Sequence, residues 1–396
     1  WNPGEQRRLV ARRVIAGAKP VTWVFEAPED QDNMDGRVER AFAESLFWGC
    51  VPLLAGDRVA GESYAPLAQR LALAGWDPVG FASAEPETVV VEHFGVTQAV
   101  RHVTIRNEDR WITDATLRVN TDTQRVVVFN PLNGNCTLAG ESVAVRLMPG
   151  EVQVVDVFAP GDMDRELEFF REAGGFGAGE ACLRTLESVR AELKAGLECD
   201  LRYPVPCVTD EANRLELVVR NAGSEAARLT GLRVIGRVFR ESPALDAEIA
   251  AGSAVTAAVH FMTADLPETG WFEVDWQATV AGGALTCTRF IRPRVADAIE
   301  LHLPAEPVEA EGLERDVELI VVNHSTNTRP FTLTWQGAFR GGSKHVRFAP
   351  VSRDIYPLSV RARRPASGEM YAILERDEEQ FAVVRFEVVF QAGPKR

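Results

Sequence analysis

The sequence has no long hydrophobic run, and no segment approaches the roughly 18 consecutive apolar residues that a membrane-spanning helix needs. It is also poor in positive charge, because 43 lysines and arginines stand against 57 acidic residues and leave a formal net charge of −14 at pH 7. Binding to nucleic acid depends on basic patches that face phosphate. We therefore expect no membrane span and no nucleic-acid partner, and an acidic surface suited to neutral ligands.

Cysteine and histidine are few and scattered. The six cysteines form no CxxC pair and the six histidines form no HxxxH or HxH pair, so we expect no metal site. No GxSxG or Cys–His signature occurs, and the glycine-rich residues 174–179 fit no nucleotide-binding motif, so we expect no cofactor. Cys199 and Cys207 leave two alternatives open, a local disulfide or two isolated buried thiols.

The chain also lacks an initiator methionine and an export signal, because it begins at Trp1 and runs directly into an amphipathic stretch. We interpret it as the C-terminal part of a larger protein. The missing leader then says nothing about export, and an extracellular or periplasmic location stays open. The 396 residues are enough for two to four domains, each with its own core.

The first 88 residues have an alternation of helical and extended patterns. The apolar stripe of residues 5–17 predicts a helix, and the run Val21–Phe25 predicts a strand buried on both faces. A helix at 36–48, a strand at 46–54 and a helix at 64–74 follow with short connections. This order is typical of an α/β barrel, and we expect the end of such a barrel here.

From residue 88 the hydrophobic period changes to that of short strands separated by turn clusters. Such spacing indicates an antiparallel sheet packed as a sandwich. Residues 162–196 return to helical spacing, with a glycine-rich turn between two helices. The predicted strands are 89–94, 99–106, 115–119, 126–129, 142–147 and 152–158.

A weak internal repeat marks the remainder of the chain. An alternating strand that ends in asparagine, Leu215–Asn221, is echoed by Val317–Asn323, and His102–Asn107 is an earlier variant. The later copies are about a hundred residues apart, which is about the length of an immunoglobulin-like sandwich. We therefore predict two Ig-like modules in the C-terminal half.

The expected architecture is multidomain and mainly β. It consists of an incomplete α/β (TIM-type) barrel end, an antiparallel β-sandwich, a helical linker and two Ig-like β-sandwiches. The expected boundaries are 1–88 for the barrel portion, 89–158 for the first sandwich, 159–198 for the linker, and 199–295 and 296–396 for the Ig-like modules.

The acidic loop after the first strand is the main concentration of chemically useful side chains. Carboxylates at the carboxyl end of a barrel strand can act as acids, nucleophiles or acceptors for sugar hydroxyls, and we select Glu26 and Asp32. Trp23 and Trp48, near successive strands, could stack on a sugar ring. The alternatives are an acidic cluster that complements the dipole of the next helix, and tryptophans that are buried for packing.

Four segments carry a family resemblance: Arg40–Pro52, Leu73–Val79, Val89–Gly95 and the opening Gly17–Val21. They resemble the late-barrel segment of bacterial glycoside-hydrolase-like proteins and its join to a β-sandwich. The resemblance covers the first quarter of the chain and, more loosely, the sandwich to residue 158. The sequence departs from the pattern at Gly56–Gly61, a shortened loop where relatives carry a longer, aromatic-rich one.

The resemblance implies a (β/α)8 barrel that hydrolyses glycosidic bonds and sandwiches that pack on it or assist carbohydrate contact. It places the catalytic carboxylates on earlier strands, upstream of Trp1, so no catalytic residue carries over to this chain. Carbohydrate would then be the partner. The alternative hypothesis is a non-catalytic protein whose Ig-like modules serve glycan binding, adhesion or spacing.

Overall fold

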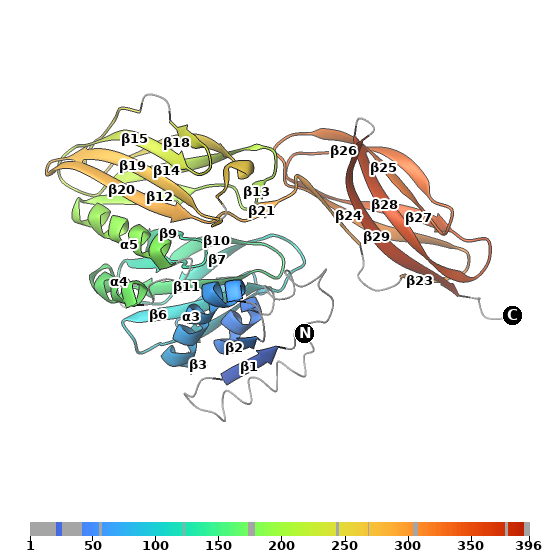
Figure 1. The fold of residues 1–396 in the computed structure, drawn as a ribbon, viewed down its shortest axis with the longest axis horizontal. Coiled ribbons are helices and arrows are strands. Elements are labelled where there is room, and N and C mark those ends of the chain that lie inside the picture. The colour runs from blue at the N-terminus through green and yellow to red at the C-terminus, as the bar shows by residue number, and fades with distance from the viewer. Residues whose placement is uncertain are drawn as a thin grey trace. The chain divides into compact units, whose positions relative to one another are not determined.

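The chain is a mainly β, multidomain protein, and its course in a computed structural model is shown in Figure 1. It divides into two compact units, here called unit 1 and unit 2. Unit 1 comprises Trp1–Val205, Arg214–Phe261 and Asp265–Pro293, and unit 2 comprises Pro206–Asn213, Met262–Ala264 and Arg294–Arg396. The structure describes residues 21–25, 42–54, 58–121, 123–172, 179–242, 245–267, 269–303, 308–376 and 379–391.

The N-terminal part of unit 1 contains a parallel strand pair, β1 (Val21–Phe25) and β2 (Cys50–Leu54), followed by α3 (Arg58–Ala74). Residues 42–48 are helical, so the helix predicted at 36–48 continues over the first residues expected to be extended. Gly49 separates this helix from β2 with a φ of +58°, and a Cβ there would lie 2.3 Å from the Phe94 ring. Only glycine fits this turn without strain.

The expectation of an α/β barrel end is wrong for the residues that the structure describes. A barrel needs a closed ring of parallel strands, whereas the next strand, β3 (Trp76–Asp77), pairs antiparallel with β5 (Val89–Phe94). The β-α-β-α order in the sequence fixes only that parallel strands can pair. It does not fix how many join, because closure depends on contacts far apart in the chain.

The first sandwich packs a sheet of order β3-β5-β6-β11-β8-β9 against a sheet of order β10-β7-β4. Its core holds Val103, Ile105, Leu117, Val155 and Val157. Six of its strands begin and end within two residues of the predicted ranges, while the short strands β4 and β9 carry no alternation long enough to predict. The bounds are β4 (Ala82–Glu85), β6 (Val100–Asn107), β7 (Thr113–Val119), β8 (Val126–Phe129), β9 (Cys136–Ala139), β10 (Ser142–Leu147) and β11 (Val152–Phe158).

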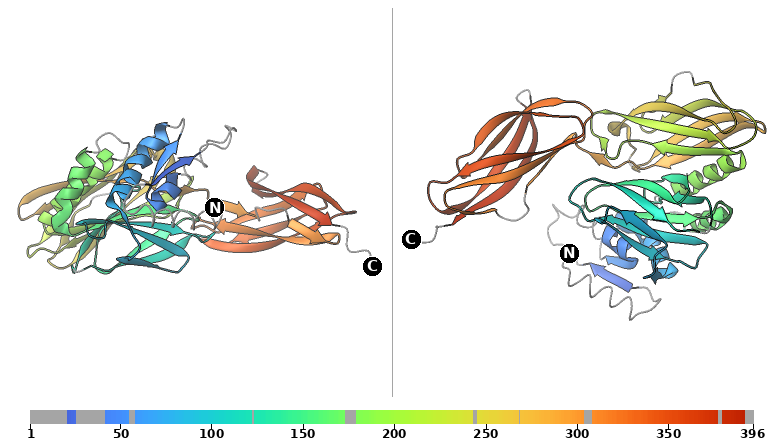
Figure 2. Two further views of the ribbon diagram at one scale, coloured as in Figure 1. Left: turned by 90° about the horizontal axis from the view of Figure 1, so that it is seen from below. Right: turned by 180° about the vertical axis from the view of Figure 1, so that it is seen from behind.

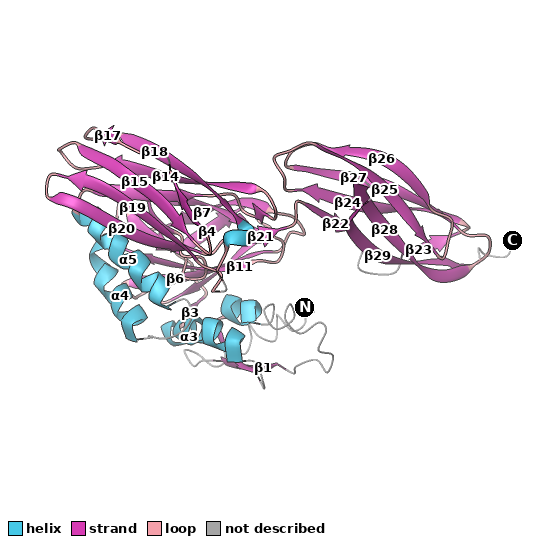
Figure 3. Ribbon diagram, turned by 45° about the horizontal axis from the view of Figure 1, so that its top comes forward, coloured by secondary structure: helices cyan, strands magenta, loops and turns pink. Residues whose placement is uncertain are grey.

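The central strands β6 and β11 are buried along most of their length because both faces of their sheet are covered. One face meets the other sheet of the sandwich. The opposite face meets α3 and two further helices, α4 (Met163–Glu172) and α5 (Gly179–Lys194), which are cyan in Figure 3. A short 3-10 turn, Pro160–Asp162, leads from β11 into α4.

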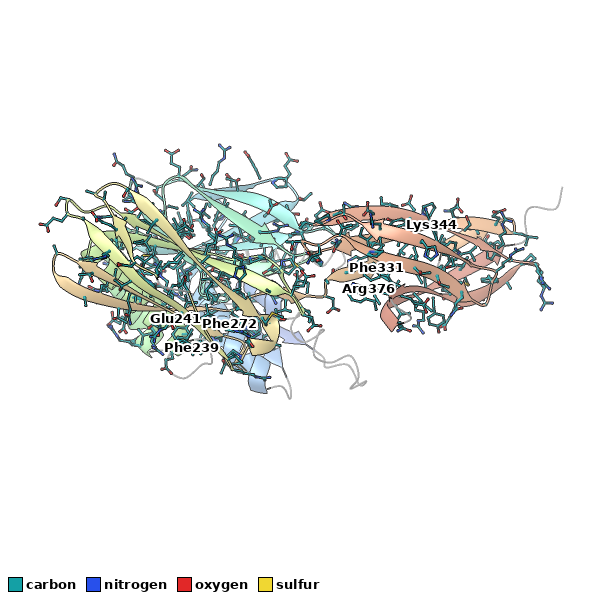
Figure 4. All side chains as sticks on the ribbon, turned by 90° about the horizontal axis from the view of Figure 1, so that it is seen from above. Phe239, Glu241, Phe272, Phe331, Lys344 and Arg376 are labelled. Carbon is teal, nitrogen blue, oxygen red and sulfur yellow. The ribbon has the colours of Figure 1, made fainter. Side chains whose placement is uncertain are left out.

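The second sandwich of unit 1 packs a sheet of order β12-β14-β18 against one of order β16-β15-β19-β20, in which β17 also pairs with β15. Trp276, Phe261 and Phe272 are buried in this part of the chain, and Phe272 is labelled in Figure 4. The bounds are β12 (Leu197–Arg202), β14 (Ala212–Asn221), β15 (Ala227–Ile235), β16 (Phe239–Glu241), β17 (Ala247–Ile249), β18 (Ala254–Met262), β19 (Phe272–Val280) and β20 (Gly283–Ile291).

Unit 2 contains a third sandwich, coloured orange to red in Figure 2, with sheets of order β22-β24-β27 and β23-β29-β28-β25-β26. Leu319, Phe331, Leu333, Leu358 and Met370 lie in its core. A parallel pair, β13 (Cys207–Val208) and β21 (Val295–Ala296), also belongs to this unit. The other bounds are β22 (Ile299–His302), β23 (Val308–Glu311), β24 (Glu314–Asn323), β25 (Arg329–Gly337), β26 (Gly342–Phe348), β27 (Ser352–Arg361), β28 (Ala366–Arg376) and β29 (Glu379–Gln391).

A buried asparagine ends one strand of each sandwich in the same way, and we call this feature the asparagine corner. Asn107, Asn221 and Asn323 are the last residues of β6, β14 and β24. Each Oδ1 accepts the N–H two residues later, at 2.9, 3.0 and 3.1 Å. Each Nδ2 donates to the carbonyl four residues later and to a carbonyl on a distant segment, that of Met148, Ile249 or Ala349. The repeat seen in the sequence is therefore a repeat of hydrogen bonds.

Candidate functional site

A pocket of about 800 Å³ lies in unit 1 between α3, α4 and the start of β6. The helices contribute residues spaced three or four apart, which places them on one face of each helix. The floor is formed by Arg70 and His102, and Phe169 forms part of the wall. The lining residues on the helices are Pro66, Gln69, Arg70, Leu73, Ala74, Arg165, Phe169 and Glu172.

His102 and Asp156 are directly opposite each other on the paired strands β6 and β11. Their side chains are 2% and 1% exposed, and His102 Nδ1 lies 2.6 Å from Asp156 Oδ1. Both residues project from the face of the sheet that the helices cover. The strand register therefore creates this buried histidine–aspartate pair, because cross-strand neighbours on one face come within contact distance.

Arg70 of α3 joins this pair to α4. Its Nη1 donates to Asp156 Oδ2 at 3.0 Å and to Glu166 Oε1 at 2.8 Å, and its Nη2 donates to Glu166 Oε2. The guanidinium also lies over the Phe169 ring, 3.9 Å from its centroid. We call Arg70, His102, Asp156 and Glu166 the charge cluster. It links two helices to the central strands through charge-assisted hydrogen bonds.

Burial shifts the ionisation of each member of the charge cluster. It raises the pKa of Glu166 to about 7, with Asp156 adding to the rise and Arg70 opposing it. Burial likewise raises the pKa of Asp156, against the effect of Arg70. Burial and the charge of Arg70 lower the pKa of His102 to about 3. The imidazole is therefore neutral at physiological pH, and its Nδ1–H donates to the Asp156 carboxylate.

Perturbed titratable groups beside a pocket are a candidate active site, and the reactivity of the buried thiol of Cys182 on α5 bears on this possibility. Cys182 is buried on α5, and its thiol donates to the Pro131 carbonyl at 3.4 Å. Burial, with Asp156 and Glu166, holds the pKa of this thiol well above its usual value. Because the thiolate is the reactive form, Cys182 is a poor nucleophile here.

A second buried ion pair connects α5 to the second sandwich. Arg289 of β20 donates from Nε to Glu192 Oε1 at 3.0 Å and from Nη2 to Glu192 Oε2, and its Nη1 donates to the Cys136 carbonyl at 2.9 Å. Both side chains are at most 3% exposed. Burial opposes the charge on Arg289, but the nearby carboxylate of Glu192 more than compensates, so the pKa of Arg289 is raised. The pair fixes α5 against β20 and β9.

In unit 2, Glu300 lies between two histidines. Its Oε2 is 3.2 Å from His302 Nε2 and 3.4 Å from His324 Nε2. Hydrogen bonds from His302 and His324 lower the pKa of Glu300 to about 2. Within the described part of the chain, no group of three or more histidine, cysteine, aspartate or glutamate side chains is arranged to hold a metal ion. We interpret this trio as a local ionic contact.

Of the four residues selected from the sequence, only Trp48 has a described side chain, and it does not line this pocket. Glu26 and Asp32 lie outside the described residues, and Trp23 is placed only through the backbone of β1. Trp48 is 5% exposed and packs in a cluster with Phe47, Tyr64 and Phe94. Its position favours the packing alternative, whereas the roles of the other three stay predictions.

No sequence motif marks the charge cluster, because each of its members is an ordinary residue in its own segment. The sequence does show two charged residues at positions where the hydrophobic periodicity of the segment predicts a core residue. Asp156 interrupts the apolar strand β11, and Glu166 lies on the apolar stripe of α4 beside Met163, Leu167 and Phe170. A charge on a buried face requires a partner, but the sequence does not say which one.

No protein-family profile matches the chain, and no curated protein matches it. Solved structures that resemble it include a red sea bream transglutaminase, with 14% identity, 54% of this chain and 34% of that chain covered, and a TM-score of 0.25. An Escherichia coli alpha-2-macroglobulin has 10% identity over 76% of this chain and 26% of that one, with a TM-score of 0.22. A Salmonella alpha-2-macroglobulin mutant has 10% identity over 78% and 23%, with a TM-score of 0.21.

The chain thus spans about a third or less of the length of these three proteins. Likeness at this level carries no information about activity, substrate or partner. The expected membership of a glycoside-hydrolase-like family with a (β/α)8 barrel is wrong, because the described strands form no barrel. Among the described residues, no helix is long and apolar enough to cross a membrane, and no feature supports a carbohydrate partner.

Proposed function

We propose that this chain has a non-catalytic role, in which a series of β-sandwich modules, two of them Ig-like, acts as a spacer. The proposed modules are residues 89–158, 199–295 and 296–396, with 159–198 as a helical linker. The asparagine corner is the observation that carries the proposal, because three sandwiches share one set of hydrogen bonds at one strand end. Repetition of a stable module is how many sandwich proteins set distances.

The buried charges are compatible with this role. In the charge cluster and in the Arg289–Glu192 pair, each carboxylate accepts from an arginine on a different element. Such contacts hold helices on sheets. A site that acts by nucleophilic catalysis would instead leave an activated nucleophile accessible to substrate, and the protonated thiol of Cys182 is not one.

Single-molecule force extension of the whole chain tests the spacer role. We expect separate unfolding events that release roughly 20–35 nm of chain each, because modules of about 70 to about 100 residues extend by about 3.5 Å per residue. Unfolding of the whole chain in one step at negligible force would contradict the proposal.

A panel of aryl glycosides, aryl esters and peptidyl amides tests the non-catalytic part. We expect no turnover above the uncatalysed rate. Turnover that Asp156→Asn abolishes while the variant stays folded would show instead that the charge cluster is catalytic.

A further inference from the structure

The charge cluster leaves one ring nitrogen of His102 without a hydrogen bond. Its Nδ1 contacts Asp156, and the structure gives Nε2 no hydrogen-bond partner among the residues that it describes. His102 is 2% exposed and lines the pocket. Because the neutral ring carries its proton on Nδ1, Nε2 presents a lone pair. This lone pair is available to a hydrogen-bond donor from a ligand or from water in the pocket.

The rim of the pocket provides a second, independent observation. Leu73 lines the pocket and is 68% exposed, which is unusual for a large apolar side chain on a helix face that meets the core. Phe169 and Pro66 lie on the same lining. The pocket therefore combines a polar floor that accepts a hydrogen bond with an apolar wall open to solvent, which is the usual composition of a small-molecule site.

The charges around the pocket indicate which ligands fit. Arg70 is neutralised by Asp156 and Glu166, and Arg165 at the rim lies 3.8 Å from Asp162. Glu172 adds an exposed negative charge at the rim, and Gln69 and Gln98 add neutral amides. The lining thus offers no unpaired cation to an anionic ligand. A cation would in turn have to compete with Arg70 for the Phe169 ring.

We propose that this pocket binds a small uncharged organic molecule that donates a hydrogen bond to His102 Nε2 and lays an apolar face against Leu73 and Phe169. The ligand class follows from the free acceptor, the exposed apolar wall and the lack of an unpaired cation in the lining. The proposal goes beyond the spacer role, and either can hold without the other.

Titration of [15N]histidine-labelled protein with three small probes tests the proposal by NMR. Benzyl alcohol carries a hydroxyl donor and an apolar ring, toluene lacks the donor, and benzoate replaces the donor with a negative charge. His102 is recognisable because its ring stays neutral down to about pH 4, as its lowered pKa of about 3 requires. We expect benzyl alcohol to shift Nε2 saturably, toluene to leave Nε2 unshifted, and benzoate to bind at least several-fold more weakly.

A pair of variants locates the binding. Leu73→Ser removes the exposed apolar contact at the rim, and we expect it to weaken benzyl alcohol binding about three- to tenfold. Val79→Ser is the matched control, because Val79 is 74% exposed and does not line the pocket. Absence of a saturable Nε2 shift, an equal shift with toluene, or equal effects of the two variants would each overturn the proposal.

Discussion

At the scale of single residues, the asparagine corner uses both ends of one amide. In unit 2, Asn323 Oδ1 accepts from Ser325 N at 3.1 Å, and Nδ2 donates to the carbonyls of Asn327 and Ala349 at 3.3 and 2.6 Å. The side chain thereby satisfies backbone groups of two segments at a buried turn. Aspartate has the same shape but only acceptors.

We expect Asn323→Asp to lower the free energy of unfolding of unit 2 by about 2–4 kcal/mol, because two buried carbonyls lose their donor and meet a negative charge. Asn327→Asp in the same turn is the control, since Asn327 is exposed, and its effect should stay within about 0.5 kcal/mol. Urea unfolding measures both. Similar losses for the two variants would show that the amide donors are unimportant.

Glu166 and His102 make the stability of the folded state depend on pH in opposite directions. The pKa of Glu166 rises from 4.5 to about 7 on folding, so the folded state binds more protons and its stability falls as pH rises through that range. The pKa of His102 falls from 6.5 to about 3, so the folded state binds fewer protons and its stability falls as pH drops through that range. Between about pH 4.5 and 6.5 the two contributions oppose each other.

Glu166→Gln removes one of these contributions. We expect the unfolding free energy of the variant, taken relative to the wild type, to rise with pH between about 4.5 and 7. Urea unfolding at a series of pH values measures this difference. Glu172→Gln, an exposed change on the same helix, controls for loss of a charge from α4. A Glu166→Gln difference that is independent of pH would contradict the shift.

Prediction from sequence was weakest at this residue scale. The asparagine corner was visible as a repeated strand end, because both the strand and the corner are local. Arg70, His102, Asp156 and Glu166 are up to 96 residues apart along the chain, and only the pairing of β6 with β11 and the packing of two helices bring them together. Local patterns showed that Asp156 and Glu166 were unusual but could not name their partners.

At the scale of elements, the Arg289–Glu192 pair fixes a helix on two sheets. The helix α5 contacts β20, β12 and β9, and the pair lies within this contact. A buried ion pair is not always worth more than apolar packing, but removal of one partner leaves a charge with no compensation.

We expect Arg289→Met to lower the free energy of unfolding by about 3–5 kcal/mol, because Glu192 remains buried without its partner. Adding Glu192→Leu should recover part of that loss. Arg184→Met on α5 is the control, since the Arg184–Glu273 pair is 41% and 28% exposed and should contribute less than about 1 kcal/mol. A double variant as unstable as the sum of the single variants would show that the two charges are not coupled.

The elements themselves were the most predictable part of the fold. Strands such as β5, β8, β10 and β11 alternate or are apolar throughout, and the helices α4 and α5 have clear stripes. Whether these elements close into a barrel could not be predicted from the same sequence patterns. Whether Trp76 and Asp77 extend a parallel sheet or pair with Phe94 and His93 is decided by the β-sandwich that follows.

At the scale of the whole molecule, the chain divides into two compact units, each with its own buried core. Leu358 is fully buried in unit 2, and Leu232 is fully buried in unit 1. The expected module boundaries at 88, 158, 198 and 295 stay predictions.

We expect the two units to give separable thermal transitions in calorimetry. Leu358→Ala should destabilise one of them by about 2–5 kcal/mol, as cavity formation in a core does, and leave the other unchanged. Leu232→Ala should do the reverse. A shift of both transitions by either variant would mean that the units unfold as one.

The burial of every cysteine has a practical consequence. All six cysteines are buried, and Cys207 belongs to unit 2, whereas Cys50, Cys136, Cys182, Cys199 and Cys287 belong to unit 1. The native protein should therefore resist alkylating reagents until a part of it opens. Mass spectrometry of the alkylated peptides would then measure the opening of each unit separately. Alkylation of Cys207 would report the opening of unit 2, and alkylation of the other five cysteines would report the opening of unit 1, without an engineered probe.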